Sequence, residues 1–265
     1  MASLVTPRIA VPIEELVKHH DFDPRGVERI ATRRVKASVA VVEPDPRWAA
    51  RYAETRARIV AALGGEEGTG RPVVVAVAHT GSTSLPGMPA KAVVDVDLTV
   101  RDVRDEAAYV PALERAGFRF LLREPAWHQH RFFCREGRGR VADDDDDDGE
   151  KEKGAAADDD DDDNFPVNLH VWGPGCPEVE RHHIFREWLL RAPDDFALYA
   201  RVKREAAAAS ARNGESVQDY NLRKEQTIRD ILDRAYRDLG YLGGGGDGAA
   251  AQKDAEAEED RVSGR

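Results

Sequence analysis

The chain has 265 residues, of which 41% are apolar and 34% charged, and its formal net charge is −11. This length allows one large or two small domains with a buried core, and no apolar run approaches the length of a membrane-spanning helix. The start of the chain lacks the apolar block of a signal peptide, and only two cysteines occur, Cys134 and Cys176. We therefore expect a cytoplasmic protein with two buried, reduced thiols.

The acidity is concentrated in two runs of six aspartates, at 143–148 and 158–163. Without these twelve residues, 39 basic residues face 38 acidic ones, so the rest of the chain has a formal charge of about +1. Residues 138–164 are predicted to be a disordered acidic insertion between two paired strands. The total charge therefore says little about the ligands of the folded part.

The first 38 residues show no sustained period except a short helix near 13–18, and we expect a flexible, loosely held N-terminal extension. The main domain is predicted to span 39–242 and to begin with a short strand over 39–42. Asp45 followed by Pro46 predicts the start of a helix that ends at two glycines, 64 and 65. The glycine-rich and then acidic residues 243–265 are predicted to be a disordered tail.

The rest of the domain mixes short strands and helices. Strands are expected over 72–78, 92–100, 118–122, 130–135 and 165–172, and helices over 107–116, from 178, from 194 and from 216 to 240. Ser216 with Asp219 forms an approximate capping box for the last helix. This order predicts an α+β domain with a mixed, largely antiparallel sheet, flanking helices and a C-terminal helical segment.

The stretch from His79 to Leu98 carries the most chemical information. It begins with a small-residue turn, in which Gly81 lets the backbone approach a ligand closely. The hydroxyls and amides of Ser82, Thr83 and Ser84 are suited to phosphate oxygens. The alternative is a tight turn with no ligand.

Asp95 and Asp97 follow on the next predicted strand, and their spacing places both carboxylates on one face of the sheet. Two adjacent carboxylates repel each other unless a cation lies between them, which predicts Mg²⁺, with Mn²⁺ as a substitute. The alternative is a solvated sheet edge, but the neighbouring valines favour a central strand. A phosphate-holding turn beside a metal-holding pair predicts a nucleotide site.

The motif HxGSTSxPGxxAKxxxD, from His79 to Asp95, resembles the GrpB family of the nucleotidyltransferase superfamily, relatives of DNA polymerase beta. Further matches are DPRW at 45–48, RFF at 131–133, LHV at 169–171, RHHIFREWL at 181–189 and the stretch 220–225 with Lys224. The resemblance covers about residues 40–240 apart from the insertion. Some relatives are fused to dephospho-coenzyme A kinase, which indicates a nucleotide context.

The resemblance implies a Mg²⁺-dependent nucleotidyltransferase that moves a nucleoside monophosphate from a nucleoside triphosphate to a small-molecule acceptor. Asp95 and Asp97 would be the catalytic metal ligands, Gly81 and Ser82 would hold triphosphate, and Lys91 would neutralise phosphate charge. The residues specify neither the acceptor nor the base. Binding to nucleic acid is not favoured, because no basic stripe with interleaved aromatic residues occurs.

Active superfamily members have a third carboxylate on a later strand, where this chain has Asn168 and His170. His170 is interpreted either as a base or metal ligand or as a structural residue. A carboxylate such as Glu124 or Glu136 close to both aspartates would favour transfer chemistry. Its absence would favour a non-catalytic nucleotide- or anion-binding domain.

The other polar candidates have open alternatives. Arg131 is expected to point into the same cleft, with an ion pair inside the sheet as the alternative. Arg181 and Arg186 are interpreted as phosphate ligands or as a solvated helix face. His79 is expected to be a structural hydrogen-bonding partner. The remaining predictions are surface positions for His128, His182 and His183, and core positions for Trp48, Phe185, Trp188 and Tyr199.

Overall fold

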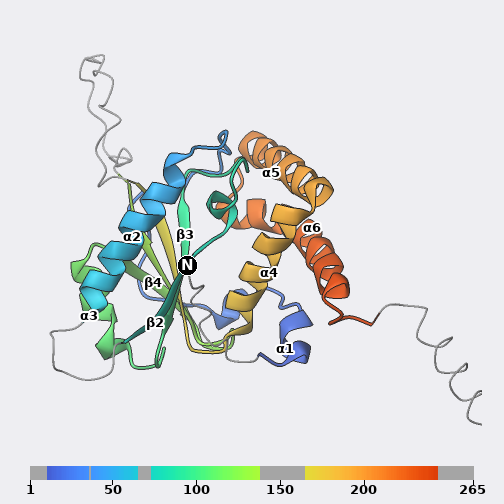
Figure 1. The fold of residues 1–265 in the computed structure, drawn as a ribbon. Coiled ribbons are helices and arrows are strands. Elements are labelled where there is room, and N and C mark those ends of the chain that lie inside the picture. Colours follow the sequence, from blue (N-terminus) through green and yellow to red (C-terminus); the bar gives the residue numbers. More distant parts are fainter. Residues whose placement is uncertain (1–10, 36, 65–72, 138–164, 244–265) are drawn as a thin grey trace, which may run out of the picture.

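The computed structural model in Figure 1 describes residues 11–35, 37–64, 73–137 and 165–243. The predicted acidic insertion and nearly all of the predicted tail lie outside these residues. Six strands of the described chain form one sheet, comprising β1 (Glu28–Arg29), β2 (Val74–Thr80), β3 (Val94–Val100), β4 (Arg119–Glu124), β5 (His130–Arg135) and β6 (Val167–Trp172). Their order is β1-β4-β5-β6-β3-β2. Only β3 and β6 are parallel among these pairs, which confirms the mixed, largely antiparallel α+β fold.

Helices α2 (Arg47–Leu63) and α3 (Val110–Arg115) cover one face of the sheet (Figure 1). On β3, Val94, Val96 and Leu98 are fully buried in the cluster that these helices complete. Because side chains alternate along a strand, Asp95 and Asp97 lie on the opposite face. The prediction of a central strand is confirmed, since β3 has partners on both sides.

Helices α4 (Pro177–Arg191), α5 (Pro193–Asn213) and α6 (Val217–Asp238) lie on the other side of the sheet (Figure 1). Leu85 and Met88, which follow the small-residue turn, pack against Tyr199 of α5 and Ile231 of α6. The C-terminal helices therefore pack directly on the motif at 79–95. The predicted capping box is present at the start of α6.

The N-terminal segment differs from the loosely held extension that we expected. The short helix is confirmed as α1 (Ile13–Val17), and its Leu16 is buried against Ile184 and Tyr236. Arg181 donates from Nε to the Leu16 carbonyl oxygen over 2.6 Å. A 3-10 turn (Pro24–Gly26) precedes β1, which pairs with β4. One apolar anchor and backbone hydrogen bonds hold this segment, so no hydrophobic period reveals it.

Other boundaries shift for local reasons. The strand expected over 39–42 is a single bridge between Val42 and Ala90. Asp45 accepts a hydrogen bond from the Arg47 amide over 2.8 Å, and α2 begins at Arg47. The helix expected at 107–116 starts as a 3-10 turn, Glu106–Ala108, before α3.

Several predicted buried side chains are found where expected. Both cysteines are free and buried. Trp48 and Tyr199 are buried, while Phe185 and Trp188 are partly buried around the cluster between α4, α5 and α6. A membrane-spanning helix was not found in the part of the chain that the structure describes.

Candidate functional site

Two cavities open on the polar face of the sheet. The larger has a volume of about 830 Å³ and is lined by the turn at 81–83, by β3 and β6, and by α5 and α6. The smaller has a volume of about 280 Å³ and lies beside β2 and α4. Asp95 lines the larger cavity and Asp97 the smaller one. The two carboxylates share a face of β3, as predicted, but they belong to different surroundings.

The turn brings its backbone into close contact with Asp95. Gly81 has φ +66° and ψ −167°, and a Cβ atom there would lie 2.4 Å from Asp95 Oδ2. Only glycine fits both the conformation and the space. Ser82 and Thr83 line the larger cavity. Ser84 instead donates its hydroxyl to the Gly81 carbonyl oxygen over 2.6 Å and stabilises the turn.

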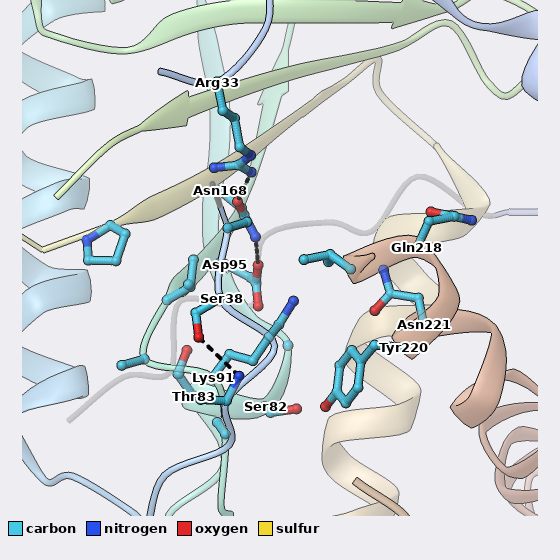
Figure 2. A pocket seen from close by; sticks show the side chains of 18 of the residues that line it. Arg33, Ser38, Ser82, Thr83, Lys91, Asp95, Asn168, Gln218, Tyr220 and Asn221 are labelled. Carbon is cyan, nitrogen blue, oxygen red and sulfur yellow. Dashed lines mark hydrogen bonds between the residues drawn. The ribbon is translucent and has the colours of Figure 1, made fainter. Parts of the chain in front are cut away.

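Asp95 ends a row of hydrogen-bonded side chains (Figure 2). Arg33 Nη2 donates to Asn168 Oδ1, and Asn168 Nδ2 donates to Asp95 Oδ1, each over 2.7 Å. The parallel pairing of β3 with β6 places Asp95 and Asn168 side by side. Tyr220 and Asn221 of α6 face this row across the cavity in Figure 2. Asn168, where a third carboxylate was sought, therefore serves as a hydrogen-bonding link.

Asp97 is 2% exposed and has both carboxylate oxygens engaged. Trp172 Nε1 donates to Oδ1 over 2.8 Å, and His182 Nδ1 lies 2.8 Å from Oδ2. Burial by itself would lower the pKa of His182, but the Asp97 carboxylate outweighs burial and raises the pKa to about 9. His182, expected at the surface, is thus the cationic partner of Asp97, although 34% of its side chain is exposed.

These contacts bear on the predicted Mg²⁺ site. An ion shared by Asp95 and Asp97 needs oxygen atoms that are free to coordinate. Both oxygens of Asp97 and one oxygen of Asp95 already accept hydrogen bonds from protein donors. As arranged here, a metal ion shared by the two aspartates would have to displace His182 from Asp97, and His182 supplies the positive charge that we expected from a cation.

Three lysines converge on the larger cavity, of which the sequence predicted only Lys91 as a phosphate ligand. Lys203 of α5 is 1% exposed, and its Nζ atom has no hydrogen-bond partner among the described residues. Lys224 Nζ lies 4.3 Å and Lys91 Nζ 5.2 Å from the ring centroid of Tyr220. Burial, followed by the neighbouring cations, lowers the pKa of Lys203 and sets that of Lys224 at about 7.

Three ionisable side chains on neighbouring strands form a hydrogen-bonded row that ends at His170. Glu124 Oε2 lies 2.7 Å from His130 Nδ1, and His130 Nε2 lies 3.0 Å from His170 Nδ1. Burial lowers the pKa of His130 to about 3 and that of His170 to about 4, so both rings are neutral near pH 7. With Glu124 ionised, the hydrogen bonds orient His170 with its Nε2 lone pair free to accept. A pKa of about 4 makes this ring a weak base.

Neither candidate for a third carboxylate adjoins both aspartates. Glu124 is linked to the site only through the two histidines. Glu136 lines the larger cavity, but its Oε1 accepts from the backbone amides of Arg34 and Val35. The condition that we set for transfer chemistry is not met by either residue.

The expectation that Arg131 points into the same cleft is wrong. Arg131 pairs with Val171, whose side chain is in the core on the α2 and α3 face. Its Nε donates to Glu106 over 2.8 Å, so Arg131 forms an ion pair, but with the 3-10 turn Glu106–Ala108 and not inside the sheet as the alternative had it. Neighbouring residues on a strand point to opposite faces of the sheet, so an error of one residue in the pairing of β5 reverses the face. The RFF motif does not specify how β5 pairs with its neighbours.

The remaining candidates have structural contacts. His79 Nε2 lies 3.1 Å from Thr83 Oγ1, and its ring stacks on Tyr52, as expected for a structural partner. Arg181 binds carbonyl oxygens of the N-terminal segment, and Arg186 reaches the Ser84 carbonyl oxygen over 3.3 Å. Neither guanidinium lines the larger cavity.

Comparisons with known proteins identify the family of this chain. A family model described as "GrpB protein" matches residues 38–234. UPF0157 protein BH1888 of Halalkalibacterium halodurans is 35% identical over 75% of this chain and 83% of its own length. UPF0157 protein SCO7215 of Streptomyces coelicolor is 32% identical over 74% of this chain and 84% of its own length.

Two further similarities are a sequence match to part of a longer protein and a match to a solved structure. A protein of Mycolicibacterium paratuberculosis named dephospho-CoA kinase is 30% identical over 78% of this chain, but the match covers 48% of that protein. The crystal structure of the conserved protein GrpB from Enterococcus faecalis superimposes with a TM-score of 0.55 at 21% identity. The superposition covers 76% of this chain and 99% of that structure, and it establishes a shared fold.

Proposed function

This chain belongs to the GrpB family, and we propose that its larger cavity binds a phosphorylated small molecule of the nucleotide class. The observation that carries this proposal is the buried amino group of Lys203, whose Nζ lies 5.2 Å from the ring centroid of Tyr199 and has no hydrogen-bond partner among the residues described. A buried charge without a partner is destabilising, and an anionic ligand is the partner that would relieve it.

The charges around the cavity favour an anion. Its lining includes five cationic side chains, from Arg29, Arg33, Lys91, Lys203 and Lys224, but only two carboxylates, from Asp95 and Glu136. Glu136 is already bound by backbone amides, and Asp95 accepts from Asn168. Burial lowers the pKa of all three lysines, Lys224 and Lys91 lower that of Lys203 further, and Lys91 lowers that of Lys224 further, so a polyanion would stabilise their charged forms together.

Size and composition fit a nucleotide. A volume of about 830 Å³ is within the range of small-molecule sites. Phosphate oxygens would contact the turn at Ser82 and Thr83 and the lysines, while the partly exposed Phe132 offers flat apolar surface to a base. One relative bears the name dephospho-CoA kinase, which refers to a phosphorylated substrate.

Binding is better supported than transfer. His170 is a weak base, Asp97 is held by His182 and Trp172, and no third carboxylate adjoins the aspartates in the described chain. Mg²⁺-dependent nucleotidyl transfer to a small acceptor is a second proposal, favoured by the direct contact between Asp95 and the Gly81 turn. It requires Asp97 to exchange His182 for a metal ion, Mg²⁺ or Mn²⁺.

Titration calorimetry with the four nucleoside triphosphates and with inorganic triphosphate, with and without Mg²⁺, tests the proposal. We expect Lys203→Met to weaken binding about tenfold or more, because it removes a buried charge from the ligand contact. The same substitution should raise the melting temperature of the free protein, because it removes an unpaired buried ammonium. Lys18→Met, the same chemical change at an exposed lysine outside the cavity, should alter neither quantity.

Unchanged affinity in Lys203→Met would contradict the proposed site. Binding that occurs only with Mg²⁺ and disappears in Asp95→Asn would favour the second proposal. A nucleotide that binds the wild type without Mg²⁺, and is not converted, would support binding alone.

A further inference from the structure

We propose that His20, His128 and Glu178 form a binding site for a zinc-class metal ion that fastens the N-terminal segment to the domain. The three residues come from distant parts of the chain. His20 follows α1, His128 lies in the turn between β4 and β5, and Glu178 is in the first turn of α4. The site is separate from both cavities around Asp95 and Asp97.

The geometry is close to that of a metal centre. One nitrogen from each imidazole and one oxygen from the carboxylate lie within 4.8 Å of one another. His128 Nε2 is 3.9 Å from Glu178 Oε1, and the two imidazole rings meet edge to face at 4.9 Å. Zinc bonds of roughly 2.0–2.2 Å hold ligand atoms about 3.3–3.5 Å apart, so the side chains need to close by about an ångström.

Unsatisfied atoms point to the same ligand. His20 Nε2 and His128 Nε2 are both buried, and neither has a hydrogen-bond partner in the described part of the chain. Buried polar atoms are nearly always paired, so two orphan nitrogens side by side call for a shared partner. His128 was expected at the surface, but its side chain is only 18% exposed.

The backbone at His128 is also unusual. His128 has φ +50° and Gln129 has φ +57°, the only non-glycine residues with positive φ in the described ranges. Two successive residues with positive φ form the two-residue turn of a hairpin, which the Trp127 carbonyl oxygen closes by accepting from the His130 amide over 3.0 Å. Gln129 Nε2 donates to the Pro125 carbonyl oxygen over 2.9 Å and holds this turn. The turn thereby keeps the His128 imidazole against His20.

The chemistry of the donors selects the metal. Two imidazoles and one carboxylate suit zinc, whereas magnesium prefers oxygen ligands alone. Arg181 binds Glu178 Oε1 and opposes a cation, so we expect an exchangeable ion that a strong chelator removes. The fourth position can take water from the cavity of about 520 Å³ that His20 and Glu178 line.

Zinc titration of the full chain by calorimetry, together with the visible absorption of bound Co²⁺, tests this site. We expect one ion per chain, and an affinity lowered about tenfold or more in His20→Gln and in His128→Gln. Zinc should raise the melting temperature of the wild type but not of these variants, because it binds only the folded site. His19→Gln is the control, since this neighbouring imidazole lies 3.3 Å from Asp233 instead.

Absence of zinc binding to the wild type would overturn the proposal. So would unchanged zinc affinity in both variants, or loss of binding in His182→Gln but not in His20→Gln. The metal-free variants are first compared with the wild type by circular dichroism. If His128→Gln does not fold, His20→Gln in the N-terminal segment decides the question.

Discussion

Asp95 and Asp97 are the same residue type on the same strand, but their different surroundings give them different roles. Asp97 is buried between Trp172 and a protonated His182, whereas Asp95 lines the larger cavity against Gly81. We expect Asp97→Asn to lower the free energy of unfolding by about 1–3 kcal/mol, because it removes the charged hydrogen-bond partner of a partly exposed imidazolium. Asp95→Asn should change stability little and alter ligand binding instead. Chemical denaturation and calorimetry on both variants separate these effects.

The sign of the pH dependence provides a check on the Asp97 pair. Asp97 has a lowered pKa and contributes stability above its usual value, while His182 has a raised pKa and contributes stability below its usual value. The loss caused by Asp97→Asn should therefore be largest between about pH 4 and pH 6.5, and it should shrink as the pH rises through about 9. Equal losses at pH 6 and pH 10 (about one unit beyond the folded pKa) would contradict the pairing.

Lys224 gives ligand binding a pH dependence of its own. Burial and the nearby Lys91 set its pKa at about 7, and a bound anion favours the charged form. Affinity for inorganic triphosphate should therefore fall in the wild type as the pH rises above about 7 toward the higher pKa of Lys224 in the complex. Lys224→Arg, which stays charged, should lack this part of the fall, while titration of the ligand is common to both proteins. Identical pH profiles in calorimetry would exclude Lys224 from the binding site.

Site residues that lie within one short motif could be predicted from the sequence to be close together. Site residues that meet only through the tertiary structure could not. The turn at Gly81 and the in-phase aspartates lie within one stretch, so their geometry follows from strand alternation. Lys203 and Lys224 meet only because α5 and α6 fold over the turn. Arg131 was placed on the wrong face because its register depends on pairing with a strand that follows the insertion.

At the level of elements, the turn after β2 connects backbone conformation to the site. Gly81→Ala should lower stability by about 1–3 kcal/mol, because its φ of +66° disfavours a side chain. The new Cβ would also meet Asp95 Oδ2 at 2.4 Å, so Asp95 must move and ligand affinity should fall. Denaturation and calorimetry on the same variant measure both effects.

Gly117 supplies a matched control for this turn. Its φ is +90°, and a Cβ atom there would meet nothing within 4 Å. Gly117→Ala should therefore lower stability through its backbone alone and leave binding unchanged. If the two variants bind ligand equally well, close contact between the turn and Asp95 does not matter for the site.

Elements with a long period or a clear boundary signal were predicted well. The three C-terminal helices have apolar stripes, α6 also has a capping box, and β5 was predicted at its observed bounds. β1 has only two residues, both exposed, so its pairing with β4 leaves no pattern in the sequence. The bridge at Val42 likewise depends on its distant partner, Ala90.

For the whole molecule, the order of strands assembles the site. Parallel pairing sets Asp95 beside Asn168 and Asp97 beside His170, and these partners are separated by more than seventy residues. No local pattern contains this pairing. The insertion lies within that interval, yet Arg135 and Val167 on either side of it are direct partners in the sheet.

That pairing leads to a prediction about the charge of the molecule. Replacing 138–164 by a short hairpin linker should leave the melting temperature nearly unchanged, because β5 and β6 already meet at the point of closure. The larger cavity is lined by Glu136, Gly137 and Pro166, so the segment that carries the twelve aspartates is joined to the described chain beside this cavity. Their removal should strengthen triphosphate binding at low ionic strength, and the gain should disappear in about 1 M salt.

A full-length variant with the twelve aspartates changed to asparagine separates charge from chain length. It should reproduce the gain in affinity of the shortened chain, because the tethered negative charge opposes an anionic ligand in both comparisons. A gain in the shortened chain alone would assign the effect to the length of the segment. Affinity that is equal in all three proteins at low salt would show that the field of the insertion does not reach the cavity, and a large drop in melting temperature on shortening would show that the segment contributes to folding.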